Sequence, residues 1–459
     1  MQKRPREGHS LRSFSYVPHT QKDRDTMLEF LGIADTEALF ADVPDKLRMT
    51  RPLELRPAMS ELELERHLGG LARQNLDVGQ VVSYLGAGSY EHYQPSVVDA
   101  IISRSEFYTS YTPYQPEVSQ GMLQAIFEYQ TMVSELTGMD IANASMYDGP
   151  TAFAEAGIVC CSHTRREKLL VARTVHPEYR AVLQTYAAGQ SIQIVELPMA
   201  EGVIDMAAMI AALDETVAGV LVQYPNFFGR IEDLRAISDA AHEVGAVVVV
   251  NTYPVALGLL ESPGAFGADL VVAEGQSLGN SMSYGGPYLG IMAAKKDLMR
   301  RLPGRIVGQT VDHDSRRGFV LTLQAREQHI RREKASSNIC SNQALNALAA
   351  TVFMSYMGPN GMRELALQNY HKAHYFYNEL RKLPGVTIPF AGPFFNEFVV
   401  SFSKSAAKIQ EEILASGIVF GLNLSEFYPE LANSVLLTVT EVRSRQEMDE
   451  TVARLGELL

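Results

Sequence analysis

Residues that could bind a ligand gather in the segment SYTPYQPEVSQG, just before a long amphipathic stretch. Two prolines stiffen this segment, which displays Tyr111, Tyr114, Glu117, Ser119 and Gln120. We expect Glu117 and Ser119 near the positive N-terminal end of a helix, where N–H groups and hydroxyls can meet an anion or a carboxylate. Rigid loops that display tyrosines are typical of sites and interfaces. A structural entry to the helix explains the same residues equally well.

A second candidate is the stretch VVAEGQSLGN followed by SMSYGGPYLGIMA. It predicts an apolar strand, a polar turn, a Gly-Gly-Pro loop and another strand. Gly285 and Gly286 permit a close backbone approach to a ligand or a facing chain. No lysine occurs between Gly264 and Lys295. The turn therefore offers no amine nucleophile for Schiff-base chemistry.

Two glycine-containing turns could be mistaken for phosphate loops. GAGSY, at Gly86–Tyr90, lacks the third glycine of a dinucleotide fingerprint, and a flexible turn is the favoured interpretation. NASMYDGPTAFAEA leads into an apolar helix, but Asp148 would repel an anion and Pro150 contributes no N–H. The P-loop and HExxH motifs are absent.

The composition is that of an ordinary globular protein of 459 residues with a net charge of −13. That charge disfavours nucleic acids and anionic membranes as partners. Cys160, Cys161 and Cys340 have no metal-ligand spacing, so we expect no metal site and reduced thiols. The basic block Arg326–Lys334 contains Glu327 and Glu333, which suits structural or intersubunit ion pairs.

Targeting signals are not apparent in the sequence. The basic start lacks the apolar core of a signal peptide, and no run of 18 apolar residues occurs. We therefore expect no membrane span and a cytoplasmic location.

The pattern of apolar residues predicts three regions. Residues 1–75 read as a helical arm, in which Ser60 and Glu63 occupy capping-box positions. Residues 76–335 alternate helices with strands, several of them continuously apolar, which predicts a large α/β domain with a mostly parallel sheet. Residues 336–459 read as a linking helix and a small C-terminal α+β domain. The expected strands of the large domain are KLLVAR, SIQIVEL, AGVLVQYP, AVVVVN, ADLVVAE and YLGIMAA.

With these segments in view, the chain resembles the P-protein family of the glycine cleavage system, specifically its N-terminal-type subunit 1 of glycine dehydrogenase (decarboxylating). The resemblance runs nearly end to end and rests on four kinds of segment. They are YVPHTQKDRDTMLEFLG, YTPYQPEVSQGMLQAIFEYQ, NASMYDGPTAFAEA with SYGGPYLG, and the long block from RLPGRIVGQTVDHD to SSNICSNQAL. It implies the fold-type I architecture of pyridoxal 5'-phosphate (PLP) enzymes.

The resemblance also implies a division of labour between two homologous subunits. In the family, subunit 2 carries the PLP lysine ahead of a loop ending Gly-Gly-Pro, and counting back from that loop places Gln276 at the lysine position. An amide nitrogen is not nucleophilic. Asn251 stands where a carboxylate would bind the cofactor's pyridine nitrogen. We therefore expect no catalytic residue and no covalent cofactor on this chain.

The implied function is that of the subunit without PLP. Together with its PLP-bearing homologue it would decarboxylate glycine and pass the aminomethyl group to the lipoyl arm of H-protein, within a heterotetramer. Two alternatives stay open. One is a self-sufficient PLP aminotransferase or decarboxylase that uses an unrecognised lysine. The other is a non-catalytic scaffold or regulator of a PLP enzyme.

Overall fold

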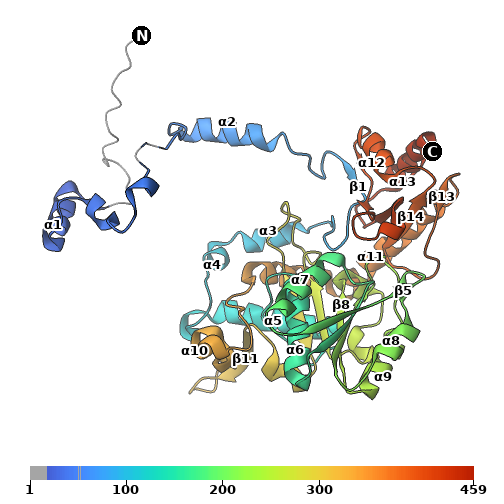
Figure 1. Cartoon of the computed structure of the whole chain (residues 1–459), viewed down its shortest axis with the longest axis horizontal. Helices are drawn as coiled ribbons and strands as arrows, with labels where there is room; N and C mark the ends of the chain where they lie inside the picture. The colour runs from blue at the N-terminus through green and yellow to red at the C-terminus, as the bar shows by residue number, and fades with distance from the viewer. Residues whose placement is uncertain (1–17, 50, 52) are drawn as a thin grey trace, which may run out of the picture. The chain divides into compact units, whose positions relative to one another are not determined.

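The computed structural model describes residues 18–49, 51 and 53–459 (Figure 1). By its internal contacts the chain divides after Asn75 into an N-terminal unit and the unit Leu76–Leu459. The N-terminal unit contains α1 (Gln21–Leu31), η1 (Thr36–Phe40), η2 (Asp45–Leu47) and α2 (Glu61–Ala72). The predicted capping box is confirmed, because Ser60 and Glu63 satisfy each other's backbone N–H groups. None of this unit's described residues is buried.

The second unit is built around a seven-stranded sheet in the order β2-β10-β9-β8-β7-β3-β4. All strand pairs are parallel except those of β10 with β9 and with β2. The six strands predicted from sequence are confirmed, and β2 (Ile141–Ala142) adds one edge. They are β3 (Lys168–Ala172), β4 (Gln193–Leu197), β7 (Val217–Tyr224), β8 (Val247–Thr252), β9 (Leu270–Glu274) and β10 (Gly290–Ala294).

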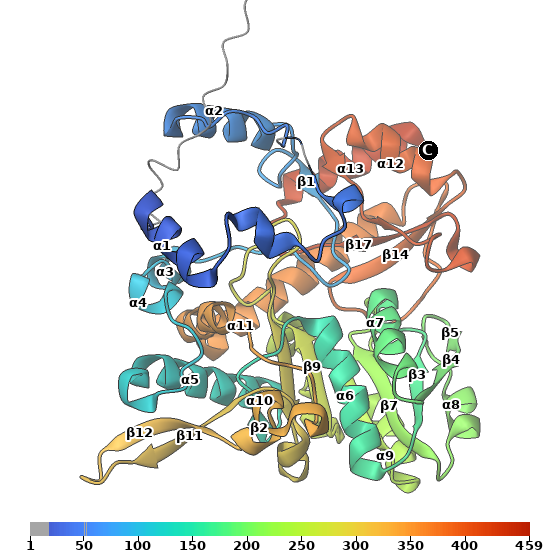
Figure 2. The same ribbon diagram turned by 60° about the vertical axis from the view of Figure 1, so that its left-hand side comes forward.

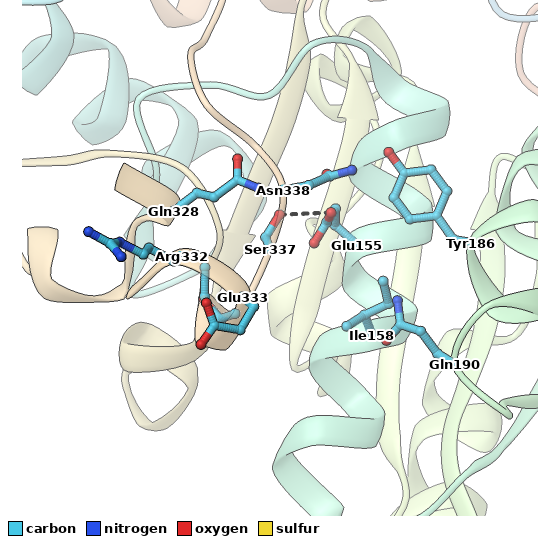
Figure 3. A pocket seen from close by; sticks show the side chains of 11 residues that line it. Glu155, Ile158, Tyr186, Gln190, Gln328, Arg332, Glu333, Ser337 and Asn338 are labelled. Atoms are coloured by element: carbon cyan, nitrogen blue, oxygen red, sulfur yellow. Dashed lines mark hydrogen bonds between the residues drawn. The ribbon is translucent and has the colours of Figure 1, made fainter. Parts of the chain in front are cut away.

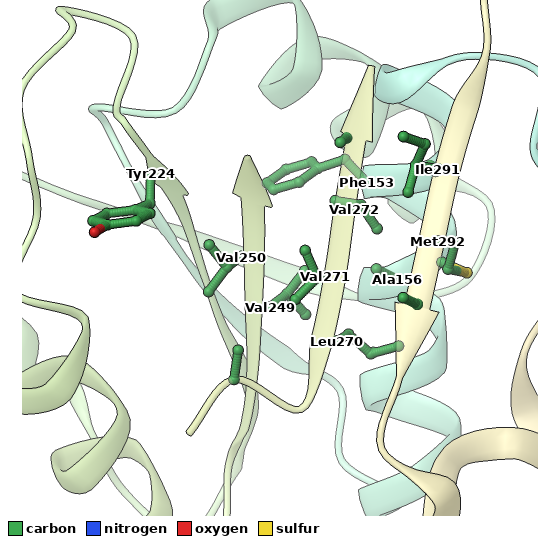
Figure 4. Packing of buried hydrophobic residues seen from close by; sticks show 14 of the residues in the cluster. Phe153, Ala156, Tyr224, Val249, Val250, Leu270, Val271, Val272, Ile291 and Met292 are labelled. Carbon is green, nitrogen blue, oxygen red and sulfur yellow. The ribbon is translucent and has the colours of Figure 1, made fainter. Parts of the chain in front are cut away.

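Helices cover the sheet and connect its strands (Figure 2). They are α5 (Gln120–Thr137), α6 (Gly149–Thr164), α7 (Pro177–Ala188), α8 (Met206–Ala212) and α9 (Leu234–Glu243), whereas the shorter helices α3 (Ser96–Ile102) and α4 (Ser105–Tyr108) precede them in the chain. The central helix is α6, which packs against β7 to β10. Figure 4 shows Phe153 and Ala156 of this helix beside Val271 and Ile291 of the sheet. Because these strands are covered on both faces, they are continuously apolar.

Short elements and a hairpin complete the large domain. The hairpin consists of β11 (Ile306–Val311) and β12 (Arg317–Thr322), and the shorter strands are β5 (Met199–Ala200) and β6 (Val203–Ile204). The short strand β1 (Val82–Ser83) instead pairs in parallel with Ile418–Val419 of the C-terminal part. The basic block contains α10 (Gln328–Arg331), between η7 (Gln324–Arg326) and η8 (Arg332–Lys334). The remaining 3-10 turns are η3 (Pro116–Val118), η4 (Pro254–Gly258), η5 (Pro263–Phe266) and η6 (Lys296–Arg301).

The C-terminal part is a small α+β domain with a four-stranded antiparallel sheet in the order β13-β14-β17-β16. It is reached through α11 (Ala344–Leu380), which is kinked at Gly358 and Pro359. Phe353 of α11 lies in the large core and Phe376 in the small one, so one helix joins both domains. The other elements are β13 (Val386–Thr387), β14 (Glu397–Phe402), α12 (Ala406–Leu414), β15 (Ile418–Val419), β16 (Leu422–Asn423), η9 (Pro429–Leu431), β17 (Ser434–Thr438) and α13 (Arg445–Leu458).

Candidate functional site

The position at which the sequence resemblance places a lysine in the PLP-bearing subunit is occupied by a glutamine whose side-chain amide is fully hydrogen-bonded. Gln276 follows β9 and is only 2% exposed. Its Oε1 accepts a hydrogen bond from the Tyr90 N–H at 2.9 Å, and its Nε2 donates to the Tyr90 carbonyl at 3.0 Å and to the Asn280 carbonyl at 2.8 Å. This amide therefore holds two loops together rather than facing a ligand.

A carboxylate of the chain itself lies at the N-terminus of α6. Glu274, the last residue of β9, accepts backbone hydrogen bonds from Gly149 at 2.9 Å, Leu289 at 2.9 Å and Gln276 at 3.0 Å. Burial raises the pKa of Glu274 to about 7, although these N–H groups favour the charged form. Asp148 caps the same helix end by accepting from the Thr151 N–H. A phosphate there would meet two carboxyl groups.

The third position, Asn251, lies near the carboxyl end of β8, between Gln223 of β7 and Val272 of β9. It is 5% exposed, and its Oδ1 has no hydrogen-bond partner among the residues that the structure describes. A neutral amide cannot keep a pyridine nitrogen protonated as a carboxylate does.

These three positions do not fit PLP. Gln276 supplies no amine, Glu274 stands at the helix end that would receive a phosphate, and Asn251 carries no charge. No chemical step through that group can be assigned to this chain.

The GAGSY turn is a buried joint between the two domains, which corrects the expectation of a flexible turn. The Ala87 N–H and the Thr438 hydroxyl both donate to Oε1 of Glu397 in β14, at 2.8 and 2.7 Å. The Tyr90 hydroxyl donates to Oε2 at 2.9 Å. A side chain at Gly86 would collide with Thr438 and Glu397. These contacts fix the loop against the small domain.

A second buried joint is formed by Tyr253, His92 and Glu441. His92 Nδ1 lies 2.8 Å from Oε2 of Glu441, and its Nε2 contacts the Tyr253 hydroxyl. Burial opposes ionisation of Glu441, but the facing His92 outweighs it and the pKa of Glu441 falls below its usual value. These three side chains thus link the end of β8 to the segment after β17.

The tyrosine segment and the basic block, far apart in sequence, lie together in the structure. Tyr114 receives a hydrogen bond on its hydroxyl from Arg305 Nη2 at 3.0 Å, and the guanidinium lies 5.4 Å from its ring centroid. Arg305 is buried and pairs with Glu327 at 3.7 Å, while His329 packs edge-on against Tyr114. Tyr111 stands apart, 80% exposed.

The remaining predicted site residues have separate surroundings. Gln120, the first residue of α5, exchanges two hydrogen bonds with the Phe319 backbone and so ties α5 to β12. Glu117 is exposed, and Ser119 makes no side-chain cap. Gly285 and Gly286 have φ of 110° and 126°, and the space above Gly285 is open. The structure therefore does not gather these residues into one site.

Three observations on the described residues concern cysteines, metal-ligand spacing and membrane-spanning helices. The three cysteines are free. One group with metal-ligand spacing occurs there, Asp312, His313 and Asp314 at an exposed hairpin turn. No described helix is both long and apolar enough to cross a membrane.

The fold defines the class of the protein. At 12% identity, the chain superimposes on a NifS-like protein with a TM-score of 0.62, covering 82% of this chain and 99% of that one. At 14% identity, it superimposes on a sphingosine-1-phosphate lyase of Burkholderia pseudomallei with a TM-score of 0.64, covering 89% and 92%. The expected α/β architecture of fold-type I PLP enzymes is confirmed.

The sequence then identifies the family. Residues 14–455 match the family described as glycine cleavage system P-protein, and the chain belongs to it. Probable glycine dehydrogenase (decarboxylating) subunit 1 of Geobacillus kaustophilus is 54% identical over 442 residues, 96% of this chain and 98% of that protein. The Bacillus subtilis protein of the same description is 53% identical over the same shares.

A crystal structure of a glycine decarboxylase (P-protein) of the glycine cleavage system, in inhibitor-bound form, is 42% identical to this chain. It superimposes with a TM-score of 0.88, covering 97% of this chain and 100% of that one. The resemblance seen in the sequence motifs is thus confirmed over 97% of the chain.

Sequence reasoning missed the glutamates that organise the site. Glu274 and Glu397 carried one available signal, since each is an acid beside a continuously apolar strand and must find partners when buried. Some of their partners, Gly149 for Glu274 and Ala87 for Glu397, lie more than a hundred residues away along the chain, which a sequence pattern does not show.

Proposed function

We propose that this chain is the P-protein subunit that carries no PLP. The single observation behind the proposal is the engaged amide of Gln276, with Glu274 beside it at the N-terminus of α6. A lysine-bound cofactor needs a nucleophilic amine and a free phosphate site, and these residues take up both places.

A homologous subunit 2 would bind PLP, which supplies an electron sink for the decarboxylation of glycine. The aminomethyl group would then pass to the lipoyl arm of H-protein. This chain would form one wall of the partner's site through Tyr114 and Arg305, and Tyr111 of the same segment is exposed. We place the complex in the cytoplasm as a heterotetramer of two such pairs.

Exposed apolar surface supports a constitutive partner. In the N-terminal unit, Phe30 is 90% exposed and Leu55 is 76% exposed. Helices without a buried face gain little stability alone, and large exposed apolar side chains mark interaction surfaces. On the second unit, Tyr284 beside Gly285 is 81% exposed. These side chains suit burial against another chain.

Reconstitution tests the proposal. The chain is co-expressed with a homologous subunit that has a lysine at the position of Gln276, and glycine-dependent exchange of carbon dioxide is measured with lipoylated H-protein. We expect activity only when both subunits are present. Full activity of the partner alone would favour the scaffold alternative, and activity of this chain alone would overturn the proposal.

Covalent labelling tests the cofactor assignment separately. Each subunit is incubated with PLP, reduced with borohydride and digested for mass spectrometry. The phosphopyridoxyl group is expected on the partner's lysine. A stoichiometric adduct on any lysine of this chain would contradict the assignment.

A further inference from the structure

A cavity of about 310 Å³ lies away from the positions of Gln276 and Asn251, beside α6 and α7. Figure 3 shows it between these helices and the segment that follows α10. The residues around it are mostly polar. They are Glu155, Ile158, Tyr186, Gln190, Gln328, Arg332, Glu333, Ala335, Ser336, Ser337 and Asn338.

The inner wall of this cavity carries a buried carboxyl group with few partners. Glu155 of α6 is 2% exposed, and its Oε1 accepts a hydrogen bond from the Ser337 hydroxyl at 2.8 Å. Among the described residues, no other donor reaches this carboxylate. A buried carboxylate with one neutral hydrogen bond is costly unless a positive group completes it.

Two further polar groups lie near the same carboxyl group. Figure 3 shows the Tyr186 hydroxyl and the Asn338 amide on the side of the cavity where Glu155 lies. Burial, and then the nearby Glu155 charge, raise the pKa of Tyr186. Neither the hydroxyl nor this amide hydrogen-bonds within the described chain, so both are free to bind a ligand.

The geometry selects the chemical class of the ligand. An anion would be repelled by Glu155 and Glu333. A bare metal ion would leave most of the space empty, since a water takes only ~30 Å³ of liquid volume. A primary ammonium group has three diverging donors and suits the carboxylate, the hydroxyl and the amide oxygen that line this cavity.

We propose that the cavity beside Glu155 binds a small molecule with a primary ammonium group, which pairs with the Glu155 carboxylate and donates to Tyr186 and Asn338. The site is separate from the proposed role in glycine decarboxylation and does not depend on it.

Protonation of the carboxyl group makes this binding dependent on pH. Burial raises the pKa of Glu155 to about 7, against the opposing hydrogen bond from Ser337. Other charged groups at the cavity are Glu333, of the same sign, and Arg332, which Figure 3 shows across the cavity from Tyr186. Because only ionised Glu155 pairs with an ammonium, affinity should rise about tenfold between pH 6 and pH 8.

Calorimetric titration of the full chain tests the proposal, with methylammonium and glycine as separate probes. Sodium acetate and tetramethylammonium serve as ligands without an ammonium N–H. We expect saturable binding of methylammonium, a loss of at least tenfold in Glu155→Gln and a smaller loss in Tyr186→Phe. Glu243→Gln, an exposed glutamate on α9, is the matched control and should bind normally.

Three outcomes would overturn the proposal: no saturable binding of methylammonium, equal binding of tetramethylammonium, or unchanged affinity in Glu155→Gln. Circular dichroism and melting temperature show whether each variant folds. If Glu155→Gln fails to fold, Tyr186→Phe decides, because it removes one hydrogen bond and keeps the carboxylate. Unchanged affinity and pH dependence in that folded variant would also reject the site.

Discussion

Two buried glutamates, Glu274 and Glu155, have similarly raised pKa values in very different surroundings. Burial raises the pKa of each to about 7. Glu274 accepts three backbone hydrogen bonds that engage both oxygens, whereas Glu155 accepts one from Ser337 and borders a cavity. The raised pKa therefore does not distinguish a structural carboxylate from a ligand-binding one. The two differ in how many further hydrogen bonds the carboxylate can still accept.

The largest effect is expected for Glu274→Ala. This change leaves the N–H groups of Gly149, Gln276 and Leu289 without their acceptor in a buried place. We expect the free energy of unfolding to fall by about 3 to 5 kcal/mol, measured by urea denaturation. A loss below about 1 kcal/mol would mean that Glu274 does not organise the site.

Glu155→Gln should change stability in the other direction, and only at neutral and higher pH. The pKa of Glu155 in the folded protein, about 7, lies above the usual 4.5, so folding is penalised increasingly as pH rises from 4.5 to 7. Glutamine keeps the acceptor for Ser337 without that penalty. We expect the variant to gain up to about 3 kcal/mol over wild type at pH 8, and nothing at pH 4.5.

Denaturation at both pH values checks this sign, in the absence of any amine. The matched variant Glu274→Gln should lose stability instead. Its side-chain amide has one oxygen for three N–H donors, and its NH₂ group would face at least one of those donors. If both glutamine variants changed stability in the same direction at both pH values, the two carboxyl groups would not differ in role.

Tyr114→Phe should affect the assembled complex more than the isolated chain. The variant loses the hydrogen bond from Arg305 but keeps the ring that the guanidinium contacts. We expect glycine-decarboxylating activity to fall about tenfold or less while the melting temperature stays the same. Tyr111→Phe tests the exposed neighbour, and unchanged activity in both would assign the segment to structure alone. Gly286→Val is a poorer probe, since a φ of 126° disfavours valine.

The smallest effect on cofactor attachment is expected for Gln276→Lys. A lysine there restores an amine, but Glu274 and Asn251 still exclude the phosphate and the pyridinium. We expect no phosphopyridoxyl adduct at position 276 after borohydride reduction. The triple variant Gln276→Lys, Glu274→Ser, Asn251→Asp is the matched comparison. An adduct in the single variant would show that Glu274 and Asn251 do not exclude the cofactor.

The fold was largely predictable because its signals are local. Continuously apolar runs such as AVVVVN and ADLVVAE mark strands covered on both faces, and Gly138 ends α5 in the left-handed conformation expected of a helix C-cap. The prediction that Gln276 replaces a cofactor lysine also rests on the sequence, because Gln276 stands at a fixed count from Gly285 and Gly286. The three-domain boundaries stay a prediction, since α11 packs in both cores.

What the sequence by itself determined was which chemical groups are present: an amide at 276, an amide at 251 and carboxyls at 274 and 155. Only the tertiary structure decided their roles, because each depends on partners distant along the chain. Tyr90 engages Gln276 and Gly149 engages Glu274, whereas Ser337 satisfies just one oxygen of Glu155. A carboxylate's burial and its remaining hydrogen-bonding capacity are properties of three-dimensional packing, which no pattern of neighbouring residues encodes.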